Sequence, residues 1–126
     1  MKINIRSKNL EITPAINDYV LRRIESVEKF LGHNKDVVDA SVFNIEIEKT
    51  THHHKEGEYF QAEVVAHVNG QNFNVKSIKE DLYQAIDDVK DELTRVLESR
   101  KEKRIGLLRR GGAKIKNILR FGAIKE

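Results

Sequence analysis

The chain has 126 residues, of which 34% are charged and 39% hydrophobic, and it contains one proline, no cysteine and no tryptophan. This length fits a single modest domain rather than a multidomain enzyme, and the lack of cysteine excludes disulfides and thiolate metal sites. Apolar runs of a few residues fall far short of the roughly 20 that a membrane span needs, and the first residues show no apolar leader. We therefore expect a cytoplasmic protein.

Charge is divided unevenly along the chain. Residues 1–99 carry 13 Lys and Arg against 18 Asp and Glu, whereas residues 100–126 carry 10 against 2. Because clustered cations release counterions when they meet phosphates, the basic C-terminus favours a polyanionic partner. A solvated tail with no partner explains the composition equally well, so composition leaves both interpretations open.

The first third of the chain predicts a strand and then a helix. Ile3 and Ile5 alternate with polar neighbours, as in a strand with one buried face. Thr13 followed by Pro14 is typical of a helix N-terminus, because threonine caps a free backbone N–H and proline has none to satisfy. Gly32 suits a left-handed helix stop. The apolar stripe between these signals consists of Ile16, Val20, Ile24, Val27 and Leu31.

Three strands are predicted next. Residues 37–48 are rich in β-branched side chains and predict a second strand. The apolar residues of its first half have the opposite parity to Phe43. Either both sides of the strand are covered there, or a bulge resets the register. Residues 60–68 alternate most clearly, with one face buried and one wet or partnered. Asn69 and Gly70 predict a tight hairpin turn into a fourth strand that contains Phe73 and Val75.

The C-terminal part predicts a long helix. Ser77 and Glu80 have the spacing of a capping box ahead of a helical pattern from about residue 81 to about residue 102, and beyond Gly106 the sequence turns irregular. The order of elements gives an α+β fold, β-α-β-β-β-α, in which a four-stranded sheet has two helices packed on one face. The other face of the sheet stays open.

The chemistry that catalysis needs is nearly absent from the sequence. No glycine-rich phosphate loop occurs, so we expect neither a nucleotide cofactor nor a small-molecule substrate. Adjacent residues His52–His54 point in different directions and lack a carboxylate or thiolate at metal-ligand spacing. We therefore interpret them as a connecting loop rather than a metal site, and expect no enzyme. His67 is interpreted as a polar residue on the open sheet face.

Cationic side chains are the remaining candidate site. Helical spacing brings Arg22, Ser26 and Lys29 near one another with Arg23 at their edge, while basic residues gather near the end of the second helix. Such a ridge would follow a nucleic-acid backbone and read little sequence. Ordinary solvated helix faces with intrahelical pairs are the alternative. Tyr83 could stack on a base, but we expect it to pack against the core.

Three runs of residues resemble a known family. They are Asn4–Ile16 with its S-K-x-L-E-I-T-P-A-I motif, Val27–Phe30, and Asp81–Asp87 with its D-L-Y-x-A-I-D motif, in matching order over residues 1 to about 104. They closely resemble the bacterial ribosome hibernation factors, also called ribosome-associated inhibitors or ribosomal subunit interface proteins. The resemblance implies a domain that occupies the mRNA and tRNA channel of the small ribosomal subunit at the subunit interface and stops translation reversibly.

The resemblance also implies which residues contact RNA, and it separates a domain at 1–104 from a basic tail at 105–126. That tail is too short for the dimerisation domain of larger members, and we expect it to thread along the mRNA path as a polycation. Ser26 and Glu92 stand where relatives are expected to carry basic residues. The candidate rRNA-binding residues are Arg22, Arg23, Lys29, Arg95, Arg100, Lys101, Lys103 and Arg104.

Two other functions remain open on the sequence. A generic double-stranded RNA binder or RNA chaperone would be stripped from ribosomes by free duplex RNA, whereas a protein fitted to the subunit cleft would not. The apolar and basic residues of the tail could instead lie on an anionic membrane surface, although we expect no membrane partner.

Overall fold

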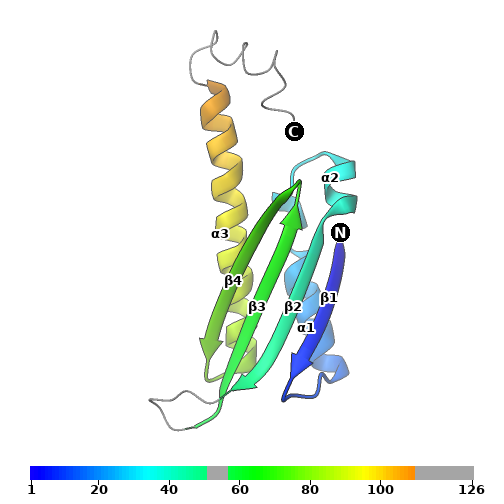
Figure 1. Ribbon diagram of the computed structural model, residues 1–126, viewed down its shortest axis with the longest axis vertical. Coiled ribbons are helices and arrows are strands. Elements are labelled where there is room, and N and C mark those ends of the chain that lie inside the picture. Colours follow the sequence, from blue (N-terminus) through cyan, green and yellow to red (C-terminus); the bar gives the residue numbers. More distant parts are fainter. Residues whose placement is uncertain (51–56, 110–126) are drawn as a thin grey trace.

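The computed structural model describes residues 1–50 and 57–109, with side chains described up to residue 100. A four-stranded sheet forms one layer, and two long helices form the other (Figure 1). The elements in chain order are β1 (Lys2–Lys8), α1 (Pro14–Glu25), the 3₁₀ helix η1 (Glu28–Phe30), α2 (Lys35–Ala40), β2 (Val42–Thr50), β3 (Tyr59–Val68), β4 (Gln71–Lys79) and α3 (Leu82–Arg109). The predicted α+β fold is confirmed.

The strands lie in the order β1-β2-β3-β4, with β1 parallel to β2 and the other two pairs antiparallel. The parallel pair is possible because α1 carries the chain back across the sheet. Asn69 and Gly70 have φ angles of 51° and 76°, the left-handed pair that a two-residue hairpin turn requires. The predicted hairpin between β3 and β4 is therefore confirmed.

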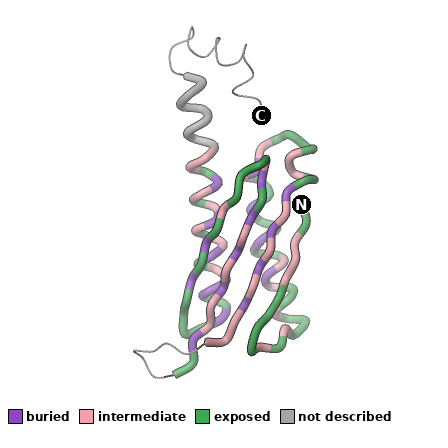
Figure 2. Tube along the Cα trace, viewed as in Figure 1, coloured by how far each residue is buried: buried purple, intermediate pink, exposed green. Residues whose placement is uncertain are grey.

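The core lies between the sheet and the helices, and Figure 2 shows buried positions alternating along the strands. Ile45, Val64 and Val75 are paired across three strands and all face the helices. α3 presents its Leu93 to them, and α1 its Ile24, each at most 1% exposed. Burial of these faces supplies most of the stability that holds the helices on the sheet.

The N-terminus of α1 is built as predicted, and Gly32 takes the predicted left-handed backbone with a φ angle of 91°, but the α-helix ends before that glycine. The Thr13 hydroxyl accepts a hydrogen bond from the Ile16 N–H at 3.2 Å, with Pro14 in the first turn. The helix ends at Glu25, and the predicted stripe continues through η1, where Val27 and Leu31 are still buried. The turn after α1 and the tighter 3₁₀ helix carry these apolar side chains into the same core as α1.

The predicted start of the second strand was wrong. Residues 37–40 are not the start of a strand: they belong to α2, whose N-cap Asn34 accepts from the N–H groups of Asp36 and Val37. The apolar residues before Val42 therefore have the opposite parity because they belong to a helix, and no bulge is needed to explain it.

The capping box at the start of α3 was also wrong. Ser77 lies buried in β4, and its hydroxyl donates to Asp88 Oδ2 at 2.6 Å. Asp81 caps α3 instead, since its carboxylate accepts from the Tyr83 N–H at 2.8 Å. α3 also runs on to Arg109, past the predicted end at about residue 102 and past Gly106.

α3 is longer than the sheet needs. Its 28 residues span about 42 Å at 1.5 Å per residue, and Leu97 is its last buried residue among the side chains that the structure describes. The segment from residue 98 to Arg109 therefore extends roughly 18 Å beyond the core, as Figure 1 shows at the end of the molecule where the helix rises past the strands.

Within residues 1–50 and 57–109, no helix is both long and apolar enough to cross a membrane. The described residues also hold no group of three His or acidic side chains placed to bind a metal ion. His52–His54 lie outside the described residues. His67 is exposed on the open sheet face, where its Nδ1 is hydrogen-bonded to Asn72 Oδ1.

Candidate nucleic-acid interface on the helix layer

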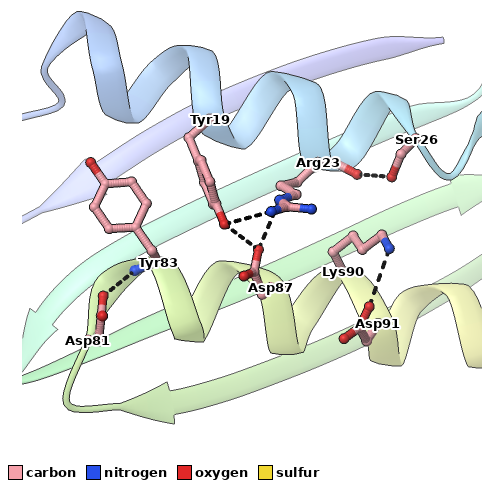
Figure 3. A network of polar contacts seen from close by, with 8 residues as sticks. All are labelled: Tyr19, Arg23, Ser26, Asp81, Tyr83, Asp87, Lys90 and Asp91. Atoms are coloured by element: carbon pink, nitrogen blue, oxygen red, sulfur yellow. Dashed lines mark hydrogen bonds and ion pairs between the residues drawn. The ribbon is translucent and has the colours of Figure 1, made fainter.

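α1 and α3 lie side by side and run in the same direction. Tyr19 contacts Tyr83, and Arg23 contacts Asp87, so residues at a constant numbering offset face each other along the two helices. Figure 3 shows the same order, with Tyr19, Arg23 and Ser26 on α1 beside Tyr83, Asp87 and Lys90 on α3. We call this line of contact the α1–α3 seam.

A three-residue polar cluster closes the middle of the seam. The Tyr19 hydroxyl donates to Asp87 Oδ1 at 2.6 Å, Arg23 Nη2 donates to the same hydroxyl at 3.0 Å, and Arg23 Nε lies 3.0 Å from Asp87 Oδ1. The Arg23 guanidinium also lies 4.9 Å from the centroid of the Tyr19 ring. Burial, and then the hydrogen bond to Asp87, raise the pKa of the Tyr19 hydroxyl. The cluster fixes the spacing of the two helices.

Three other predicted cations, Arg22, Arg95 and Lys29, are more accessible to a partner than Arg23. The side chains of Arg22 and Arg95 are 78% and 67% exposed, and each lies opposite the buried stripe of its helix. Lys29 is exposed in η1, with its Nζ 5.2 Å from the Phe30 ring centroid. Arg22 and Arg95 therefore lie on the outer face of the helix layer, and Lys29 is exposed just beyond the end of α1.

These exposed cations have carboxylate neighbours, and their pairing is weak. Arg22 Nε lies 3.0 Å from Asp18 Oδ2 one turn away, and Arg95 donates to both carboxylate oxygens of Glu92, at 3.0 Å and 2.6 Å. The hydrogen bond from Arg95 lowers the pKa of Glu92. Exposed pairs of this kind contribute about 0–1 kcal/mol, so a phosphate can replace the carboxylate at little cost.

The structure does not gather all predicted cations into one ridge. Arg95 borders a hollow that also includes Asn74 and Lys76 of β4, so it leans away from the seam that contains Arg23. Arg100 is half-buried, and the side chains of Lys101, Lys103 and Arg104, on the last turns of α3, lie outside the described residues. The helix layer therefore presents a broad, discontinuous set of cations.

Sequence reasoning missed two features of the seam. Lys90 lies across from Ser26, beyond Arg23, with its Nζ 3.3 Å from Asp91 Oδ1 (Figure 3). Tyr83 was expected to pack against the core, yet it is 40% exposed and contacts Tyr19. Neither placement had a sequence signal, because both depend on how α1 and α3 are aligned.

The fold and this surface define a class: a small α+β domain whose helix layer carries exposed cations suited to a phosphate backbone. Comparison with known proteins identifies the family. The model of the sigma 54 modulation protein / S30EA ribosomal protein family matches residues 3–105. The chain therefore belongs to this family.

Individual relatives agree with this assignment. The chain is 32% identical over 103 residues to the ribosome hibernation promoting factor of Klebsiella oxytoca, a match covering 82% of this chain and 96% of the relative. It is 33% identical over 103 residues to the ribosome hibernation promotion factor of Bacillus subtilis, where the match covers 82% of this chain and 50% of the relative.

Among solved structures, the Protein Y N-terminal domain of Thermus thermophilus matches with a TM-score of 0.64 and 25% identity, over 79% of this chain and 98% of that one. A ribosomal subunit interface protein from Coxiella burnetii, 16% identical with a TM-score of 0.59, shares the fold over 81% of this chain and 99% of that one. The resemblance seen in the sequence motifs is confirmed.

Proposed function

We propose that this protein is a ribosome hibernation factor that binds the small ribosomal subunit at the subunit interface and occupies the mRNA and tRNA channel. Family membership supports the hibernation role. The inhibition would act by occupancy: a rigid domain fills a site, so no bond is made or broken. Binding to ribosomes would also place the protein in the cytoplasm.

The observation that carries the proposed orientation is the contrast between the two faces of the domain. The helix layer exposes Arg22 and Arg95, whose carboxylate pairs are weak and exchangeable, together with the exposed Lys29. The middle of the open sheet face instead carries Glu46 and Glu63, which lie directly opposite each other on β2 and β3. Arg6 and Lys76 flank these two carboxylates in the same row, so the cations of this row already face carboxylates on neighbouring strands. We therefore assign the helix layer to ribosomal RNA.

A-form RNA suits such a surface. Its deep, narrow major groove hides the bases, and proteins recognise its shape, phosphates and 2′-hydroxyls. The basic end of α3 extends past the core, so it can follow RNA that the sheet does not reach. We include Arg23, Arg100, Lys101, Lys103 and Arg104 in the proposed contact, with Arg23 acting mainly by holding the seam.

The test compares two triple substitutions with the same change in charge. Replacing Arg22, Lys29 and Arg95 with Glu reverses the cations of the helix layer, and replacing Lys2, Arg6 and Lys8 with Glu reverses exposed cations of the sheet face. In sedimentation with small subunits, the helix-layer variant should lose binding, and the sheet-face variant should keep it. Circular dichroism checks that both remain folded.

The salt dependence sharpens this test. Affinity falls as salt rises, and each phosphate contact that is lost should make the slope of log K against log salt less steep by about 1. Equal loss of affinity in both triple variants would contradict the assignment of the helix layer. Displacement of the wild-type protein by modest amounts of free duplex RNA would favour a generic RNA binder instead.

The basic tail, residues 105–126, is proposed to add affinity without setting the position, and its first five residues belong to α3. Residues 110–126 carry five Lys and Arg against one Glu. A chain ending at Arg109 keeps α3 whole and should bind more weakly at low salt, with a shallower salt dependence. Unchanged affinity and slope after this truncation would contradict a role for residues 110–126 in RNA binding.

A further inference from the structure

Tyr83 is an exposed aromatic side chain that core packing does not explain. Among residues with described side chains, the exposed large hydrophobic residues are Ile78 and Tyr83, each 40% exposed. Leu82, Ala85 and Ile86 supply the buried stripe of this helical turn, whereas Tyr83 points along the outer side of the seam. Its ring therefore lies on the face assigned to RNA.

The ring is held in place before any partner arrives. It packs edge-to-face against Tyr19, with ring centroids 4.7 Å apart and an interplanar angle of 88°. Tyr19 is itself held by its hydrogen bonds with Asp87 and Arg23. Figure 3 shows the Tyr83 ring face-on, on the near side of the sheet. A pre-oriented aromatic ring loses little conformational entropy when it binds.

The charges around this ring favour a base over a phosphate. Asp81 caps α3 through the Tyr83 N–H, and Asp87 lies one turn further along the same side of the helix. These carboxylates repel a phosphate brought close to the ring. An unpaired base is neutral and can lie flat on the ring, while its backbone lies nearer to Arg22, one turn from Tyr19 on α1.

We propose that Tyr83 is a stacking platform for one unpaired base of ribosomal RNA, held from the side by Tyr19. This rests on the proposed function and deepens it, because the cations position the RNA backbone whereas the ring adds a contact to a base. Stacking on an aromatic ring is tolerant of base identity, so the platform selects for an unpaired nucleotide rather than for a sequence.

The first test separates the ring from its bulk. Tyr83→Phe keeps a stacking ring, Tyr83→Leu removes it, and Ile78→Ala is a control with equal starting exposure on the open sheet face. Small-subunit affinity should fall between about fivefold and a hundredfold for Tyr83→Leu, and stay within about twofold for the other two. Thermal unfolding of each variant shows whether the fold is intact.

The second test reads the base directly. Chemical probing of unpaired bases in the small subunit should reveal one position that is protected by the wild type and by Tyr83→Phe, and exposed with Tyr83→Leu. Unchanged affinity of Tyr83→Leu would overturn the proposal. A weaker Tyr83→Leu with no ring-dependent base protection would also overturn it, and would indicate that the ring contacts a ribosomal protein.

These outcomes are distinct from failure of the proposed function. If the wild-type protein does not bind small subunits, hibernation by occupancy is wrong. If the wild type binds and only the Tyr83 variants behave contrary to expectation, the stacking proposal alone is wrong.

Discussion

The two faces of this sheet are made from alternate residues of the same strands, but they present different surfaces. One face is covered by α1 and α3, whose outer side exposes Arg22, Lys29 and Arg95 beside Tyr83. On the uncovered face, Glu46 and Glu63 occupy the middle, with Arg6 and Lys76 at the two edges of the same row. The two charges of each sign cancel in this row, and carboxylates such as Asp18 and Glu92 lie beside the cations of the helix layer, so the two faces differ in how their charges are arranged.

The largest expected effect concerns what holds the helix layer in place. Leu93→Ala empties a fully buried position of α3 and should lower the free energy of unfolding by about 2–5 kcal/mol. Val65→Ala, half-buried on the open face, should cost less than about 1 kcal/mol. Denaturant unfolding measures both values. Similar losses would mean that the open face is as tightly packed as the core.

A middle-sized effect concerns the seam and its dependence on pH. Burial raises the pKa of Tyr19, so the folded state favours the neutral hydroxyl. Its stabilisation is complete below the unfolded pKa of about 10 and is lost as pH rises through the higher folded pKa. Wild type should therefore exceed Tyr19→Phe in unfolding free energy by about 1 kcal/mol at pH 8, because the half-exposed hydrogen bond to Asp87 is lost.

This difference between wild type and Tyr19→Phe should shrink as the pH is raised above 10. The comparison with the variant isolates Tyr19, because Tyr59, whose pKa is also raised by burial, titrates in both proteins. A difference that stays constant up to pH 12 would show that the Tyr19 hydroxyl does not stabilise the seam.

The smallest effect concerns Glu46 and Glu63 on the open sheet face. They are directly opposite on antiparallel strands, and like charges in that position are unfavourable. Glu63→Gln removes this repulsion and also the attraction to Lys76 on β4, whereas the control Glu48→Gln removes only the attraction to Lys8, because Glu48 lies opposite Gln61. Glu63→Gln should therefore be more stable than Glu48→Gln by a few tenths of a kcal/mol at low salt, and by less at high salt. Equal stability of the two variants would contradict repulsion between Glu46 and Glu63.

Local patterns were enough to predict most of the fold. Thr13 with Pro14 starts α1, Asn69 with Gly70 forms the hairpin, and the alternation of residues 60–68 appears directly in β3. Each of these signals acts within a few residues through capping, left-handed backbone geometry or strand parity. They need no information about distant parts of the chain.

The wrong predictions share a different origin. Ser77 and Glu80 have the spacing of a capping box, but Ser77 is drawn into β4 by the burial of its face and by its bond to Asp88 on α3. Residues 37 and 38 are β-branched valines, yet Asn34 caps a short helix there before β2 begins at Val42. In both cases packing in the folded molecule prevailed over a local preference.

The sequence by itself determined the α+β class, the family motifs and the excess of cations toward the C-terminus, because parity, spacing and composition are properties of neighbouring residues. The tertiary structure alone decided that Arg23 would meet Asp87, that Arg95 would lean toward β4, and that Tyr83 would stand exposed against Tyr19. Those relations depend on the alignment of two helices more than sixty residues apart in the chain, which is set by how both pack on one sheet.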